Sequence, residues 1–127
     1  RLKLAQQMMG SPYLWGGNST KGNDCSGFTQ NIFEASGIQL PRDARQQALY
    51  GKEIVPNNTW SNIQSGDLLF FCKEDRVTHV GMSLGQYDFI HQGGMVSINS
   101  LDKTSILFAP KRLDTFLFIK RIHQSLI

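Results

Sequence analysis

The chain has 127 residues, 40% of them hydrophobic and 18% charged, which fits one globular domain, so we expect a single unit spanning residues 1–127. Its formal net charge is +3, but the lysines and arginines are scattered rather than clustered, which argues against a nucleic-acid-binding protein. No apolar run approaches the roughly 20 residues that cross a bilayer, which argues against a membrane span.

Apolar residues recur at helical spacing in the first part of the chain. The pattern predicts three helices, which run from Leu2 to Met9, from an N-cap at Asp24 to Ala35, and from Asp43 towards Gly51. The segment 11–23 is rich in glycine and is expected to be a loop.

Beyond Gly66 the pattern changes to the period of two that is typical of strands. Five strands are predicted, at Leu68–Cys72, Thr78–Leu84, Tyr87–Gln92, Val96–Asn99 and Phe116–Ile122. Helices followed by consecutive strands predict an α+β fold, in which the helices pack on an antiparallel sheet.

The residues around Cys25 carry the strongest chemical signal, in the run Asp24-Cys25-Ser26-Gly27-Phe28. A thiol in the first turn of a helix faces unpaired backbone N–H groups and the positive end of the helix dipole, and both favour the thiolate. The same N–H groups can hold the oxyanion of an acyl-transfer intermediate. Cys25 could instead be a small buried hydrophobic residue, but its polar neighbours and the glycine-rich segment before it favour a nucleophile.

A cysteine nucleophile needs a base within hydrogen-bond reach, and the base needs a group that orients it. His79 lies on a predicted strand, on the face opposite Val80 and Met82. Gly81 beside it is expected to let the end of the cysteine helix approach the sheet. His91 lies on the next predicted strand, its hairpin partner. We therefore predict that His79 is the base and that His91 fixes its tautomer.

Other readings of these residues remain open. His91 could be a structural strand residue, and His123, near the chain end, is expected to be solvated. Cys25, His79 and His91 could bind zinc, but no CxxC or HxxxH spacing supports a metal site. A disulfide to Cys72 is also conceivable, although Cys72 follows an apolar run and is expected to be a structural residue in a buried strand.

Six blocks of residues, in this order along the chain, resemble the NlpC/P60 family of cell-wall peptidases. They are Tyr13-Leu14-Trp15-Gly16-Gly17, Asp24-Cys25-Ser26-Gly27-Phe28, Leu40-Pro41-Arg42-Asp43, Gly66-Asp67-Leu68-Leu69-Phe70-Phe71, Thr78-His79-Val80-Gly81-Met82 and Phe89-Ile90-His91. The resemblance implies a papain-like α+β fold, with N-terminal helices packed on a central antiparallel sheet of about five or six strands.

The resemblance also implies an activity. Cys25, His79 and His91 would form a catalytic triad that hydrolyses the amide bond to the γ-carboxyl of D-glutamate in a peptidoglycan stem peptide, with no metal and no cofactor. Such chemistry serves any acyl transfer, so an amidase or acyltransferase on the same fold stays an alternative, as does a non-catalytic cell-wall-binding module.

Further site residues follow from the same resemblance. Tyr13 matches a position near the oxyanion and the substrate. Asp24 and Ser26 match positions that help to hold a free amino group of the substrate, a role that suits a carboxylate. Arg42 and Asp43 match a segment that borders the cleft, and a salt-bridged helix start is an equally good interpretation of these two residues.

The implied substrate, peptidoglycan, places the protein in the bacterial cell envelope, either periplasmic or secreted, with a cytoplasmic recycling role as the alternative. Family members with this pattern often carry bacterial SH3-like domains upstream. We therefore expect the chain to be the catalytic, C-terminal part of a longer protein.

Overall fold

The computed structural model describes residues 25–93 and 95–122. Its helices are α2 (Cys25–Ala35), α3 (Ala44–Gln47) and α4 (Pro110–Thr115). Its strands are β1 (Lys52–Ile54), β2 (Leu68–Lys73), β3 (Arg76–Gly85), β4 (Asp88–Gln92), β5 (Val96–Ser100) and β6 (Phe116–Arg121). None of these helices is long and apolar enough to cross a membrane. The helix predicted from Leu2 to Met9 and the loop after it lie outside the described residues.

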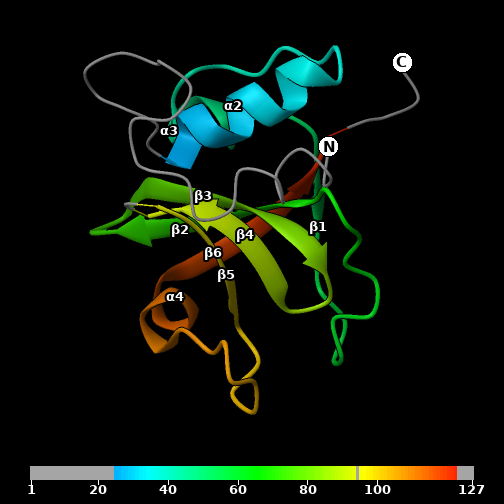
Figure 1. The fold of residues 1–127 in the computed structure, drawn as a ribbon, viewed down its shortest axis with the longest axis vertical. Coiled ribbons are helices and arrows are strands. Elements are labelled where there is room, and N and C mark those ends of the chain that lie inside the picture. The colour runs from blue at the N-terminus through cyan, green and yellow to red at the C-terminus, as the bar shows by residue number, and fades with distance from the viewer. Residues whose placement is uncertain (1–24, 94, 123–127) are drawn as a thin grey trace.

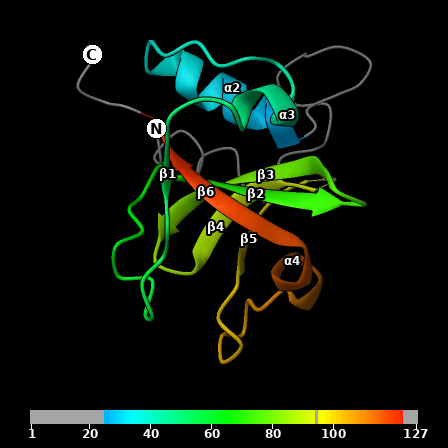
Figure 2. The ribbon, with the colours of Figure 1, turned by 180° about the vertical axis from the view of Figure 1, so that it is seen from behind.

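The strands form one sheet in the order β1-β6-β2-β3-β4-β5, with every neighbouring pair antiparallel. Helices α2 and α3 cover one face of the sheet, and α4 lies on the other side (Figure 1). The view from behind shows β6 crossing the sheet from α4 towards β1 (Figure 2). The predicted α+β class is confirmed, as are all five predicted strands.

Strand β2 is buried on both of its faces, because packed side chains cover both sides of the sheet. Leu68 and Phe70 join a core that includes Phe28 of α2. Leu69 and Phe71 join a second core on the opposite face. A strand that is buried on both faces reads as a continuous apolar run rather than as an alternating pattern.

Helix α2 begins at Cys25 and ends before Gly37, as predicted. Its apolar stripe is fully buried against the sheet, with Phe28, Ile32 and Phe33 each at most 1% exposed. Gly37 has a φ of +85°, a conformation that glycine adopts without strain. The start of α2 is therefore held in place by the packing of the rest of the helix.

The third predicted helix is shorter than expected, because α3 ends at Gln47 and the chain then turns towards Gly51. Two elements were not predicted, the short edge strand β1 and the helix α4. Neither has a run of buried apolar residues from which it could be recognised.

A bulge interrupts the pairing of β2 with β3. Phe71 pairs with His79, but Cys72 pairs with Val77, so Thr78 has no partner in β2. A bulge changes the direction of the strand and of the groups next to it. In this fold the bulge lies immediately before His79.

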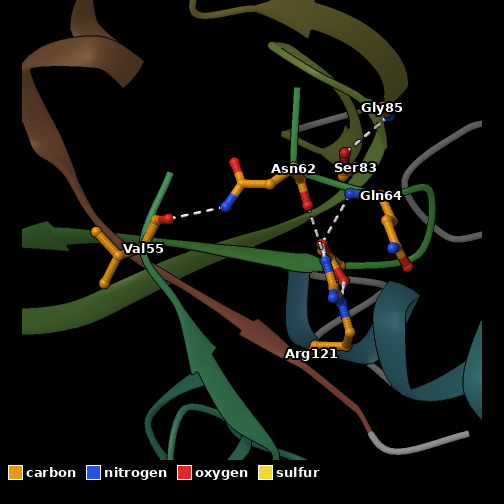
Figure 3. Close-up of polar contacts among 7 residues, drawn as sticks. Val55, Asn62, Gln64, Ser83, Gly85 and Arg121 are labelled. Atoms are coloured by element: carbon orange, nitrogen blue, oxygen red, sulfur yellow. Dashed lines mark hydrogen bonds and ion pairs between the residues drawn. The ribbon is translucent and has the colours of Figure 1, made fainter. Parts of the chain in front are cut away.

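The other end of β2 is tied to β6 by a buried ion pair. Asp67, which is 2% exposed, accepts two hydrogen bonds of 2.8 Å from the guanidinium of Arg121. The backbone N–H of Gln64 donates to the same carboxylate, and the carbonyl of Asn62 accepts from Arg121 (Figure 3). This cluster lies at the end of β2 away from the bulge, so we assign it a structural role.

Candidate active site

Cys25, the first residue of α2, is 8% exposed. Its thiol donates to the backbone carbonyl of Thr78, with 3.7 Å between Sγ and the oxygen. Thr78 is the bulged residue of β3, and bulges often re-aim groups next to active sites. The start of α2 and strand β3 thus meet at Cys25 and Thr78, one residue before His79.

His79 and His91 lie on the adjacent strands β3 and β4, and both are buried. Their rings meet edge to face, with Nε2 of His79 2.7 Å from Nδ1 of His91. The contact that the hairpin predicted between the two rings is confirmed. The other nitrogen of His91, Nε2, lies 2.8 Å from Oδ1 of Asn99 on β5. Three consecutive strands therefore contribute one side chain each to a hydrogen-bonded chain.

The amide of Asn99 sets the direction of these hydrogen bonds. Its Nδ2 donates to the carbonyl of Leu107 over 3.2 Å, so its Oδ1 accepts from Nε2 of His91. A neutral His91 then offers a lone pair at Nδ1, and His79 donates to it from Nε2. The lone pair of a neutral His79 is consequently on Nδ1, which is the atom that can accept a proton.

Burial keeps both histidines neutral. It lowers the pKa of His79 from the ordinary 6.5 to about 2, with further repulsion from Arg112 and from His91. Burial also lowers the pKa of His91 to about 4, where the hydrogen bond to Asn99 acts in the opposite direction and Arg112 in the same one. A neutral imidazole is the form that acts as a general base.

His79 lies on the face of β3 opposite Val80 and Met82, as predicted, with its ring 5.5 Å from that of Phe71. The role predicted for Gly81 is wrong. A Cβ at Gly81 would lie 2.8 Å from Cδ2 of Phe89 and 3.3 Å from Cβ of His91. Gly81 therefore makes room for side chains of β4, while α2 packs on the other face.

Gln47 joins the start of α2 to the segment before α3. It is fully buried, and its Nε2 donates to the carbonyls of Ser26 and Pro41 over 2.9 and 2.8 Å. Its Oε1 accepts from the hydroxyl of Thr29 over 2.8 Å. Arg42 donates to the hydroxyl of Ser26 over 3.1 Å. The predicted site residues Ser26 and Arg42 are thus in contact beside Cys25.

Two open clefts meet at Thr78. The smaller has a volume of about 260 Å³ and is lined by Cys25, Ser26, Asp43, Ala44, Arg45, Val77 and Thr78. The larger has a volume of about 930 Å³, and its lining includes Cys72, Thr78, His91, Asn99 and Arg112. Because Thr78 lines both, the two clefts lie on either side of the segment that contacts the thiol.

Cys72, expected within a buried strand, is half-buried and lines the larger cleft, since β2 runs out to the surface at this end. In the described part of the chain, neither Cys25 nor Cys72 forms a disulfide. Across residues 25–93 and 95–122, no group of three His, Cys, Asp or Glu side chains is placed to hold a metal ion. Tyr13, Asp24 and His123 lie outside the described residues, so their predicted roles stay predictions.

Sequence reasoning missed Asn99 and Arg112. The one signal for Asn99 was its place on a predicted strand, and the observed pairing of β4 with β5 then sets it opposite Phe89, on the same face as His91. Arg112 had no such signal, because it comes from α4, which was not predicted.

The sequence profile of the NlpC/P60 family matches residues 10–108. The chain belongs to the NlpC/P60 family. It is 41% identical, over 102 residues, to a γ-D-glutamyl-L-lysine dipeptidyl-peptidase of Bacillus subtilis, an alignment that covers 76% of this chain and 33% of that protein. This NlpC/P60 chain therefore spans about a third of the length of that relative, and the resemblance found in its motifs is confirmed.

Solved structures agree with this assignment. The NlpC/P60 chain matches an NlpC/P60 family protein of Bacillus cereus with a TM-score of 0.77 and 31% identity, covering 94% of this chain and 38% of the other. It also matches the NlpC/P60 domain of the peptidoglycan hydrolase SagA with a TM-score of 0.69 and 26% identity, covering 95% of both chains.

Proposed function

We propose that this NlpC/P60 chain is a cysteine endopeptidase that hydrolyses the amide bond between the γ-carboxyl of D-glutamate and the diamino acid of peptidoglycan stem peptides. The observation that carries the proposal is the hydrogen-bonded chain from Asn99 through His91 to His79, beside the thiol of Cys25. The relatives support the substrate class, since one is named a γ-D-glutamyl-L-lysine dipeptidyl-peptidase and another a peptidoglycan hydrolase.

In the first half of the reaction, Nδ1 of His79 takes the proton of the Cys25 thiol as Sγ attacks the carbonyl carbon of the γ-D-glutamyl bond. Backbone N–H groups at the start of α2, together with Tyr13, hold the oxyanion. His79 then gives the proton to the leaving amine, and the C–N bond breaks. The products of this half are the free amine of the diamino acid and a thioester on Cys25.

In the second half, His79 accepts a proton from water as the water oxygen attacks the thioester carbonyl. The C–S bond breaks, the carboxylic acid is released, and the sulfur regains the proton. His91 keeps the ring and the tautomer of His79 unchanged throughout, and no metal or cofactor takes part. The low pKa of His79 favours return of its proton in both halves.

The acyl half of the substrate is assigned to the smaller cleft. Ser26 and Asp43 line it beside Cys25, and Arg42 contacts Ser26. Asp24 and Ser26 are proposed to hold a free amino group at the L-alanine end, with Arg42 at the border of the cleft. This assignment places the γ-carbonyl at the thiol and the leaving amine on the histidine side.

The cellular location follows from the proposed substrate. Peptidoglycan lies outside the cytoplasmic membrane, so we propose that the protein acts in the bacterial cell envelope. We also propose that the chain is one catalytic domain of a longer protein, because it spans about a third of the relative from Bacillus subtilis. The upstream SH3-like domains are proposed from the family resemblance of the motifs.

The test compares two substrates, L-Ala-γ-D-Glu-diaminopimelate and N-acetylmuramoyl-L-alanine, by mass spectrometry of the products. We expect free diaminopimelate from the first and no product from the second. Release of L-alanine from the second would indicate an amidase, and transfer to an added amine without hydrolysis would indicate an acyltransferase. Binding of peptidoglycan without turnover of either substrate would indicate a binding module.

A further inference from the structure

Arg112, on α4, places a guanidinium in the larger cleft. Across the described ranges 25–93 and 95–122, its side chain takes part in no ion pair and no hydrogen bond. Arg121 provides the contrast, because Asp67 accepts hydrogen bonds from both Nε and Nη2 of its guanidinium. An arginine that is half-buried and lacks a carboxylate is placed to bind one from outside the chain.

The side chain of Arg112 is held in position by packing. Its guanidinium lies over the ring of Phe71, 5.7 Å from the centroid, and Phe71 is fully buried. Helix α4 is anchored in turn, because the N–H of Ala109 donates to the carbonyl of Ser100 at the end of β5 over 3.0 Å. The guanidinium of Arg112 is therefore largely oriented before a ligand binds.

The guanidinium also lies beside the histidine chain. A Cβ built on Gly93 would be 3.8 Å from Nη2 of Arg112 and 3.8 Å from Cε1 of His91. The charge of Arg112 adds to the effect of burial in lowering the pKa of His79 and His91, and burial lowers the pKa of Arg112 while the charge of Cys25 acts in the opposite direction. Arg112 is thus close enough for its charge to act on the base and on the thiol.

The position of Arg112 determines which half of the substrate it can contact. In the proposed function, on which this inference rests, His79 protonates the leaving amine, so the leaving residue lies on the histidine side of the thiol. The larger cleft is on that side. Among the described residues, its charged lining includes Lys73, Lys111 and Arg112 as cations and Asp114 as a carboxylate. A leaving residue with a negative group fits this charge.

We propose that Arg112 is a specificity-determining residue that binds a carboxylate of the leaving diamino acid. Two carboxylates share this chemistry, the α-carboxylate of a residue that ends the stem peptide and the side-chain carboxylate of diaminopimelate. A planar guanidinium binds either one through two parallel hydrogen bonds. Binding also offsets the repulsion between Arg112 and His79, so a carboxylate in this place makes His79 a better base.

The experiment uses one acyl half, L-Ala-γ-D-Glu, with four leaving groups: L-lysine, L-lysine amide, diaminopimelate and aminomethylcoumarin. Arg112→Gln is compared with the wild type and with Lys103→Gln, which removes an exposed charge outside the cleft. We expect Arg112→Gln to lower kcat/KM by about 10- to 100-fold for leaving groups with the recognised carboxylate. The loss should be at least about 10-fold smaller for aminomethylcoumarin, which has no carboxylate.

The leaving groups separate the two carboxylates. A loss with L-lysine but not with its amide identifies the α-carboxylate, and a loss confined to diaminopimelate identifies the side-chain carboxylate. An equal loss with all four leaving groups, or no loss with any of them, would overturn the proposal.

A second measurement does not depend on turnover. Free diaminopimelate is added to the protein, and its binding is monitored through the NMR shifts of the arginine Nε–H groups. A wild type that cleaves nothing but binds diaminopimelate through Arg112 would contradict the proposed function alone. A wild type that neither cleaves nor binds through Arg112 would contradict both.

Discussion

Nε2 of His79 lies 2.7 Å from Nδ1 of His91, and the two rings are nearly perpendicular, with an interplanar angle of 87°. The carbonyl of Leu107 orients Asn99, Asn99 orients His91, and His91 places the proton of His79 on Nε2. A backbone carbonyl thus determines, through two side chains, which nitrogen of the proposed base carries the lone pair.

Asn99→Leu should lower kcat/KM by about 10-fold, because one neutral hydrogen bond to His91 is lost and its tautomer is no longer set. KM should change little, since Asn99 acts through His91. The ¹⁵N shifts of the His91 and His79 rings should show a mixture of tautomers in the variant and one tautomer each in the wild type. Unchanged ring shifts and unchanged activity would rule out this positioning role.

Acid should destabilise the fold before most carboxylates titrate. The folded-state pKa values of His79 and His91, about 2 and about 4, lie below the ordinary 6.5. Between the folded-state pKa of each histidine and 6.5, the unfolded state binds more protons than the folded state. The free energy of unfolding is therefore greatest above about pH 6.5 and falls as the pH falls. Each histidine contributes a loss of up to about 1.4 kcal/mol per pH unit.

Urea unfolding between about pH 7 and about pH 5 measures this effect, since the slope of stability against pH reports proton uptake. His91→Asn is the control, because it removes one of the two groups. We expect a shallower slope for the variant than for the wild type. Equal slopes would mean that folding does not lower the pKa of His91.

Gly81→Ala should destabilise the protein by about 1–3 kcal/mol, because the added Cβ overlaps the ring of Phe89 and crowds His91. Activity should fall as well, since His91 has to shift. Gly93→Ala is the matched control for stability, because its nearest neighbours would be 3.8 Å away. Thermal unfolding of both variants makes the comparison, and equal melting temperatures would contradict this account of Gly81.

Arg121→Met should cost about 3 kcal/mol of stability, because it leaves the buried carboxylate of Asp67 without its counter-ion. Asp67→Asn should cost less, since Arg121 is partly exposed and can be hydrated. Lys103→Met is the control, an exposed cation. Urea midpoints rank the stability of the three variants. A larger loss of stability for Asp67→Asn than for Arg121→Met would contradict the expected order.

Most of the fold could be predicted because its elements carry their own apolar patterns. The stripe on α2 and the run in β2 identified both elements, and the hairpin of β3 and β4 brought His79 and His91 together as expected. Strand β1 has only exposed or half-buried residues, and α4 buries none. Neither element has an apolar periodicity, so the sequence gives no sign of them.

The parts of the site that were missed depend on tertiary packing. Arg112 belongs to α4, and its position over Phe71 joins residues far apart in the sequence. The sequence correctly predicted that another element packs closely against Gly81. Which element does so depends on how the strands pair. Asn99 lies on a predicted strand, and only its register with β4 places it beside His91.

The measurement that tests the central claim most directly is the release of diaminopimelate from L-Ala-γ-D-Glu-diaminopimelate by three proteins, the wild type, Cys25→Ala and Cys72→Ala. Neither cysteine forms a disulfide in the described residues, and Cys25 is the one that lies at the start of α2 and in contact with the residue before His79. The account predicts release by the wild type and by Cys72→Ala, and none by a folded Cys25→Ala. Release by Cys25→Ala at the rate of the wild type would contradict it.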